Sequence, residues 1–146
     1  MSIDRSHLKN FKLNWIKRQL NIIMLDFVSD HQEKKYIHVQ CFFRAIHDGK
    51  VIFASPDMYK SSSQDRRIEF DWTEPGTTIF DESLVANRDL FENFYVIELN
   101  QIGCDVEIRL SNETILQIMV DSVEKDEMYR FFDDSKDILV RSEERR

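Results

Sequence analysis

Apolar and polar residues alternate along much of this chain, and a period of two predicts β-strands with one buried face. The pattern is clearest in residues 36–43 and 104–110, where every second residue is apolar. Such alternation favours an antiparallel sheet that is covered on one side. The strands predicted in this way fall into two groups of three: residues 20–28, 36–43 and 50–55, then residues 94–99, 104–110 and 114–120.

The two groups follow the same order along the chain, and each is followed by an aspartate, Asp57 or Asp121. Asp48-Gly49 and Ser111-Asn112 supply residues that tolerate the positive φ of tight turns between strands. We therefore expect two related three-stranded meanders that build one β-rich domain over residues 1–141.

The first residues of the chain follow a different spacing. Leu8, Phe11 and Trp15 recur every three or four residues, which is typical of one face of a helix. Asp4 or Ser6 can cap such a helix at its start. The pattern predicts an N-terminal helical segment over residues 4–18.

A second change of spacing follows the last meander. Asp121 and Glu124 form a carboxylate version of a capping box, which predicts a short helix near residues 122–132. Residues 137–141 are expected to form a last strand, and residues 142–146 a charged tail. These elements together place the chain in the α+β class, with a predominantly antiparallel sheet.

The segment that joins the two groups of strands is rich in polar residues but also contains Phe and Trp. Residues 61–67 are expected to form a loop, and residues 67–72 alternate as a short strand does. Residues 74–76 predict a turn. Residues 81–90 are compatible with one or two helical turns.

Composition narrows the classes of function. The net charge of −7 argues against general nucleic-acid binding, which requires an excess of Lys and Arg, and it suits a basic protein partner. No apolar run reaches the roughly 18 residues that a membrane span requires. The first residues lack the apolar stretch of a secretory signal, so we expect a cytoplasmic protein without a membrane partner.

Few residue patterns point to catalysis or to a cofactor. Cys41 and Cys104 fall on the apolar register of predicted strands and are expected to be buried, reduced thiols. The four His residues are scattered, with no spacing that would gather the three or four ligands of a metal. The three Gly residues are isolated, which excludes the usual phosphate-binding loop. No cofactor or metal is expected.

Three acidic residues are the nearest approach to an active site. Asp57, Glu69 and Asp71 resemble the carboxylates of restriction-type nucleases, but Asp71 stands where those sites have a lysine. A third carboxylate raises the negative charge where the transition state needs a cation, so we expect no enzyme. The acidic residues at 98, 105 and 107 fit the polar register of strands, where side chains face water. The aromatic residues Trp15, Trp72 and Tyr95 are expected in the core.

Residues 105–112, 115–121 and 127–132 resemble a pattern found in small bacterial immunity proteins of polymorphic toxin and contact-dependent growth inhibition systems. In that pattern a strand ends at an Asn-Gly turn, the returning strand ends in Asp, and a short aromatic segment follows. Residues 15–23 are similar to the opening of the same group. Glu113 stands where the pattern has Gly, and Tyr129 where it has Trp.

The resemblance implies a protein that binds the toxic C-terminal domain of a cognate effector and masks its active or substrate-binding surface. The residues expected to contact a basic toxin lie in the segment between the two groups of strands: Asp71, Trp72, Glu74, Asp81 and Glu82. Two alternatives stay open. One is a β-rich ligand-binding or regulatory domain without a toxin partner, and the other is an enzyme that uses Asp57, Glu69 and Asp71. The oligomeric state is not determined by the sequence.

Overall fold

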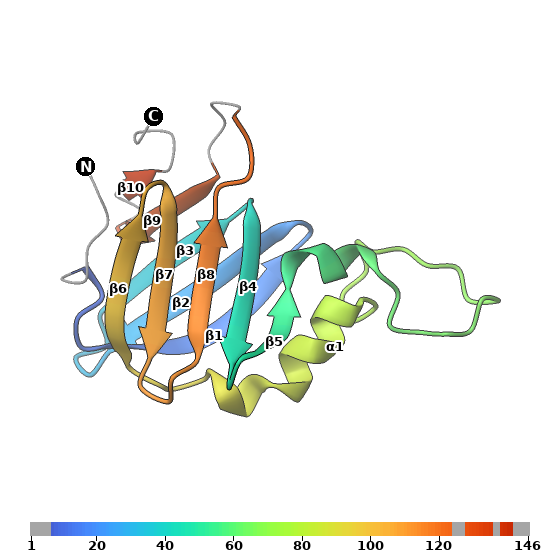
Figure 1. Ribbon diagram of the computed structural model, residues 1–146, viewed down its shortest axis with the longest axis horizontal. Coiled ribbons are helices and arrows are strands. Elements are labelled where there is room, and N and C mark those ends of the chain that lie inside the picture. Colours follow the sequence, from blue (N-terminus) through green and yellow to red (C-terminus); the bar gives the residue numbers. More distant parts are fainter. Residues whose placement is uncertain (1–6, 124–127, 136–137, 142–146) are drawn as a thin grey trace.

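Two antiparallel five-stranded sheets pack against each other in the computed structural model (Figure 1), which describes residues 7–123, 128–135 and 138–141. Sheet A has the strand order β1-β2-β3-β9-β10 and sheet B the order β5-β4-β8-β7-β6. The strands of the two sheets cross obliquely in Figure 1. Over the described residues the fold is thus mostly antiparallel β-sheet with one α-helix, which is consistent with the α+β class.

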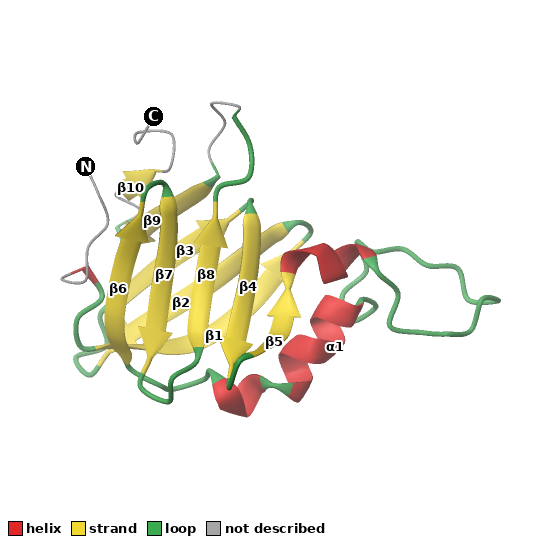
Figure 2. Ribbon diagram, viewed as in Figure 1, coloured by secondary structure: helices red, strands yellow, loops and turns green. Residues whose placement is uncertain are grey.

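The elements have the following bounds. Sheet A contains β1 (Phe11–Gln19), β2 (Ile22–Ser29), β3 (Lys34–Val39), β9 (Tyr129–Asp133) and β10 (Ile138–Arg141). Sheet B contains β4 (Phe42–His47), β5 (Lys50–Ala54), β6 (Val96–Ile102), β7 (Asp105–Leu110) and β8 (Ile115–Met119). The helix α1 (Ile79–Ala86) lies between two short 3-10 helices, Ser55–Tyr59 and Arg88–Leu90, and Figure 2 shows all three gathered near β5.

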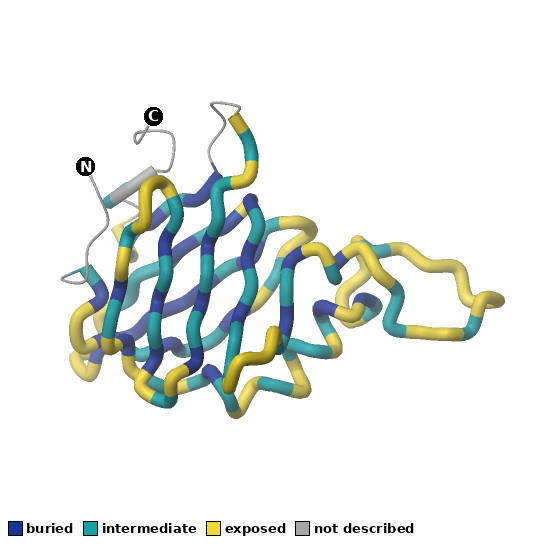
Figure 3. Tube along the Cα trace, in the orientation of Figure 1, coloured by how far each residue is buried: buried dark blue, intermediate teal, exposed yellow. Residues whose placement is uncertain are grey.

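The core lies between the two sheets and is built from alternate residues of nearly every strand, as the banding of buried residues in Figure 3 shows. Phe43, Phe53 and Phe91 are each at most 2% exposed, and their rings pack edge-on or stacked within 6.0 Å between centroids. Aromatic side chains at such distances contribute both area burial and favourable ring geometry. Seven of the eleven Phe of the sequence are buried in this core.

The second predicted meander is confirmed, because β6, β7 and β8 are consecutive antiparallel neighbours in sheet B. The first is wrong. Residues 36–43 are not one strand but two, β3 in sheet A and β4 in sheet B, with the chain crossing between the sheets at Gln40 and Cys41. The alternation continues across this crossing because both sheets turn their inner faces to the same core.

The predicted N-terminal helix over residues 4–18 is also wrong where the structure describes it, since residues 11–19 form β1. A register shift between Leu13 and Trp15 places a bulge at Asn14. A bulge inserts one residue and moves the buried side chains to the other parity, so Leu13 and Ile16 both point into the core. The resulting spacing of three imitates a helical face.

The predicted helix near 122–132 is wrong over its described part, because residues 129–133 form β9. Tyr129 and Phe131 are buried while Arg130 and Phe132 are half-buried, which is the period of a strand. Glu124, the second residue of the predicted capping box, lies outside the described residues. The last strand is confirmed as β10.

Three smaller predictions also need correction. Residues 67–72 form no strand; they belong to an exposed loop without a neighbouring strand. Cys41 is buried as expected, but Cys104 is exposed in the turn between β6 and β7. Trp15 and Trp72 are half-buried and Tyr95 is 39% exposed, so none of the three belongs to the core.

Candidate functional site: a groove between strand β1 and helix α1

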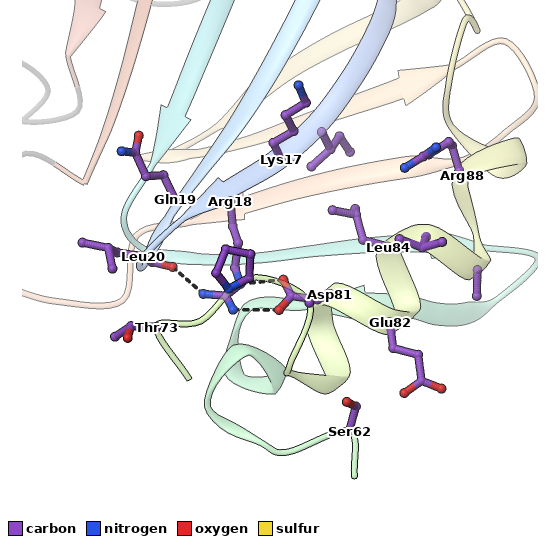
Figure 4. Close-up of a pocket in the computed structure, with 15 residues that line it drawn as sticks. Lys17, Arg18, Gln19, Leu20, Ser62, Thr73, Asp81, Glu82, Leu84 and Arg88 are labelled. Atoms are coloured by element: carbon purple, nitrogen blue, oxygen red, sulfur yellow. Dashed lines mark hydrogen bonds and ion pairs between the residues drawn. The ribbon is translucent and has the colours of Figure 1, made fainter. Parts of the chain in front are cut away.

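A groove of about 930 Å³ lies between the end of β1 and helix α1. Residues 16–20 form one wall and residues 84–86 of α1 form the other. The loop between the Ser55–Tyr59 helix and α1 contributes Ser62, Thr73 and the Pro75-Gly76 turn to the lining. Figure 4 shows side chains from all three segments around the groove.

Helix α1 begins where the sequence supplies a complete capping box. The Thr78 hydroxyl accepts a hydrogen bond from the Asp81 N–H at 3.1 Å, and the Asp81 carboxylate accepts one from the Thr78 N–H at 3.2 Å. Two of the unpaired N–H groups at the helix start are satisfied in this way. The capping box fixes both the direction of α1 and the position of the Asp81 carboxylate.

The same carboxylate forms a bidentate ion pair with Arg18 of β1. Arg18 Nε lies 2.6 Å from Asp81 Oδ1, and Nη2 lies 2.7 Å from Oδ2 (Figure 4). The two side chains are only 5% and 12% exposed. Paired N–H donors in this fork geometry are among the stronger polar contacts in proteins.

Arg18 also fixes the loop that precedes α1. Its guanidinium donates hydrogen bonds to the backbone oxygens of Trp72 at 2.8 Å and Leu20 at 3.0 Å. A single side chain on the inner face of β1 therefore connects the strand, the loop and the helix. We call these contacts between Arg18, Asp81 and the Trp72 carbonyl the Arg18 clamp.

The environment of Asp81 lowers the pKa of its carboxyl group. Burial alone raises this pKa, but the hydrogen bonds from Arg18 and Thr78 favour the charged form and outweigh burial. Asp81 is therefore ionised at neutral pH, and its charge is neutralised by Arg18.

The structure places the five predicted contact residues in one region. Trp72, Glu74 and Asp81 surround the Arg18 guanidinium, the first two through their backbone oxygens. The Trp72 ring packs edge-on against Tyr59 at 4.9 Å between centroids. Asp81 is engaged within the protein, which leaves the exposed carboxylate of Glu82 as the acidic group of α1 that faces solvent beside the groove.

Asp71 is exposed and shapes its own turn. Its carboxylate accepts hydrogen bonds from the Thr73 backbone N–H at 3.0 Å and from the Thr73 hydroxyl at 2.6 Å, and these contacts lower its pKa. Asp57, the first of the three carboxylates that resemble a nuclease site, pairs with Lys60 at 3.1 Å. Within the described ranges, no three His, Cys, Asp or Glu side chains gather in a way that could hold a metal ion.

Sequence reasoning missed Arg18 and the apolar residues of the groove. Leu20 is 53% exposed and Val85 is 64% exposed, although both are large and apolar. The sequence did contain a signal for Arg18. This cation lies two residues after buried Ile16 and therefore on the inward-facing register of β1. A buried cation implies an acidic partner, but that inference requires residues 11–19 to be recognised as a strand.

A second unusual carboxylate lies near the β1 bulge. Asp26 of β2 is opposite Trp15, is 1% exposed, and has one carboxylate oxygen without a hydrogen-bond partner in the described structure. Burial raises its pKa, although the nearby Lys34 charge and a hydrogen bond from Asn14 act in the opposite direction. The pKa of Asp26 is thus raised, whereas the pKa of Asp81 is lowered.

Comparison of the chain with protein-family models, curated proteins and solved structures found no match. Among the described residues, no helix is long and apolar enough to span a membrane.

Proposed function

We propose that this chain is a cytoplasmic immunity protein, which binds the toxic C-terminal domain of a cognate bacterial effector and masks its active or substrate-binding surface. One observation carries the proposal: an apolar groove lies directly beside a strongly acidic segment of the chain. Residues 57–82 contain seven acidic and three basic residues, so they account for −4 of the net charge of −7.

This combination supports binding to a basic protein surface. Complementary charge accelerates encounter between proteins, and apolar anchors that become buried supply much of the affinity. Val85 and Leu20 are exposed apolar residues in the groove, and Tyr59, which is 52% exposed, packs on Trp72 nearby. Glu82 lines this apolar area together with Lys17 and Arg88, and Asp71 and Glu74 lie on the loop beside it, so charged residues accompany the apolar ones as in the rim of an interface.

A pull-down of the tagged chain from its native cells, followed by mass spectrometry, tests the proposal. We expect one polypeptide in stoichiometric amounts that matches the end of a large secreted effector, and co-expression should then protect cells from that domain. Recovery of no such polypeptide from cells that express the effector would contradict the proposal.

Charge reversal then tests the assigned surface. We expect Glu82→Lys to slow association with the captured partner and to weaken its salt dependence. Glu33→Lys changes the net charge equally, but Glu33 lies beyond the far end of β2, away from the groove. Equal association rates for the two variants would show that the groove is not part of the interface.

The volume of the groove favours a second candidate, a small-molecule binding domain. About 930 Å³ falls within the range of sites for drug-sized ligands. A metabolite that raises the melting temperature of the wild type but not of Val85→Glu would support this function. A screen in which no metabolite has this effect would favour the protein partner.

A further inference from the structure

We propose that two copies of this chain associate through strand β6, with the two β6 strands pairing antiparallel about a two-fold axis at Asn100. The two copies of sheet B then join into one continuous sheet. This inference goes beyond the proposed function and does not depend on it, because it rests on the free edge of sheet B.

The two edges of sheet B differ in how they are covered. At β5, helix α1 packs against the strand, and the Asn87 side-chain amide donates a hydrogen bond to the Ile52 backbone oxygen at 3.2 Å. At β6, no backbone hydrogen bond joins the strand to any strand but β7 within the residues that the structure describes. An uncovered edge presents N–H and C=O groups to other chains. Strand β6 is therefore the edge of sheet B that can pair with another strand.

The sequence of β6 contains few of the features that keep edge strands apart. The strand has no Pro or Lys, and its only charged residue is Glu98, whose carboxylate pairs with Arg109 at 3.3 Å. The bulge near Ile97 lies at the start of the strand, and residues 98–102 pair with β7 in an unbroken register. Ile97 and Ile102 are 52% and 62% exposed. A regular edge with exposed apolar side chains favours pairing with another strand.

A second copy of β6 fits this edge when the two-fold axis lies at Asn100. Glu98, Asn100 and Ile102 share the outer face of sheet B, because they alternate with Leu99, which is 3% exposed. Each Ile102 then lies opposite Glu98 of the other copy, and the two Asn100 amides lie side by side. Like charges directly opposite each other destabilise a strand pair. This register keeps the two Glu98 carboxylates apart and covers each exposed Ile102.

The distribution of charge also favours β6 as the contact between copies. The net charge of −7 makes two copies repel each other. Residues 57–82, which carry −4 of this charge, follow β5 at the opposite edge of sheet B, and Figure 1 shows β6 on the side of the molecule away from them. Pairing at β6 therefore keeps the acidic segments far apart. It also keeps the groove of each copy away from the contact.

Sedimentation velocity of the full chain alone tests the association. We expect the mass to rise from one chain to two between about 1 µM and about 1 mM, and to stop there because a two-fold contact uses both β6 edges. Hydrogen exchange at the higher concentration should show added protection at alternate amides of residues 97–102. A mass of one chain throughout, or growth beyond two chains, would overturn the inference.

Substitutions at Ile102 test the register. Ile102→Glu faces Glu98 of the other copy and should raise the dissociation constant of the dimer at least about tenfold, whereas Ile102→Lys faces the same carboxylate and should change it by less than about threefold. Val85→Glu is the control, because it changes the net charge as Ile102→Glu does, at a residue of similar exposure on α1, 64% against 62%. Equal weakening by the two Ile102 variants, or by Val85→Glu, would contradict the assignment.

Disulfide cross-linking locates the two-fold axis. Residues directly opposite each other in an antiparallel pair have Cα atoms about 4.5–5.5 Å apart, which a disulfide can span. In a chain that carries Cys104→Ser, whose remaining Cys41 is buried, we expect Asn100→Cys to form a linked dimer with oxidised glutathione. Val51→Cys, at a residue of β5 that is 52% exposed, should form little. Absence of the Asn100→Cys dimer, or equal amounts from both variants, would overturn the inference.

The outcomes for the proposed function are separate, because β6 lies apart from the groove. A chain that captures a toxin domain but sediments as a monomer at every concentration overturns the dimer only. A dimer that captures no toxin domain from cells that express the effector overturns the immunity function only.

Discussion

The two halves of β1 are connected to the rest of the protein in different ways. At the start of the strand, the backbone of Leu13 is hydrogen-bonded to Asn93 and Phe94, in the segment that leads into β6 of sheet B. At the end of the strand, the connection consists of side chains, since Arg18 reaches across the groove to Asp81. Backbone pairing leaves no room for another chain, whereas a side-chain bridge leaves the strand edge open. We refer to these as the closed corner and the open corner.

The largest loss of stability is expected from a substitution that disrupts the closed corner. Phe91 is 1% exposed, packs edge-on against Phe53 at 5.5 Å between centroids, and positions the chain that reaches Leu13. We expect Phe91→Ala to lower the free energy of unfolding by about 3–5 kcal/mol. Val85→Ala at the open corner should change it by less than about 0.5 kcal/mol. Urea denaturation measures both, and similar costs would show that the corners do not differ.

Removal of the Arg18 clamp should cost less than the loss of Phe91. Arg18→Ala leaves Asp81 charged and mostly buried without its partner, and we expect a loss of about 3 kcal/mol. Arg67→Ala is the control, because Arg67 forms an ion pair with Asp65 on the exposed loop and should show no measurable change. A negligible effect of Arg18→Ala in thermal or urea unfolding would mean that α1 is held by its apolar contacts alone.

A smaller effect is expected from the helix cap. Thr78→Ala removes the hydroxyl that accepts from the Asp81 N–H and should cost about 1 kcal/mol. Thr78→Ser keeps the hydroxyl and should lose less. If both variants lose the same free energy of unfolding, the buried methyl group of Thr78 and not its hydrogen bond is responsible.

The smallest effects should appear in the pH dependence of stability, with opposite signs at two carboxylates. The lowered pKa of Asp81 gives stability that is present above its unfolded value of about 3.9 and is lost as the pH falls through the folded pKa. The raised pKa of Asp26 gives stability that is present below about 3.9 and is lost as the pH rises through the folded pKa.

Neutral substitutions separate these contributions. Asp26→Asn should be relatively more stable than the wild type at pH 7 than at pH 3, and Asp81→Asn relatively less stable at pH 7 than at pH 3. Unfolding free energies measured across this range provide the test. Parallel profiles for the two variants would contradict the opposite shifts.

The sequence predicts sheet B better than sheet A, for a physical reason. The strands β6, β7 and β8 are neighbours in both sequence and space, so alternation and turn residues determine their pairing. Each sheet also contains one pairing between distant segments, β3 with β9 in sheet A and β4 with β8 in sheet B, but the first strand of sheet A contains in addition the bulge at Asn14. A bulge changes the parity of the buried residues, which local periodicity cannot distinguish from the start of a helix.

The candidate site was predictable in part. The acidic residues at 71, 74 and 82 stand out by composition, and all three lie beside the groove or on its loop. Arg18 and Val85 were not predictable in the same way. The role of Arg18 depends on a partner 63 residues away in the sequence, and the exposure of Val85 depends on the absence of a covering element.

The pairing of β3 with β9 has a consequence for synthesis of the protein. Residues 34–39 emerge from the ribosome early, but their neighbours in sheet A, residues 129–133, emerge about ninety residues later. At roughly 5–20 residues per second, the edge of β3 has no strand to pair with for about 5–20 seconds. Nascent chains in this interval present an open edge to other chains. Sheet A is therefore completed after most of the chain has been made, and slow translation before residue 129 prolongs the period in which the nascent chain is prone to aggregate.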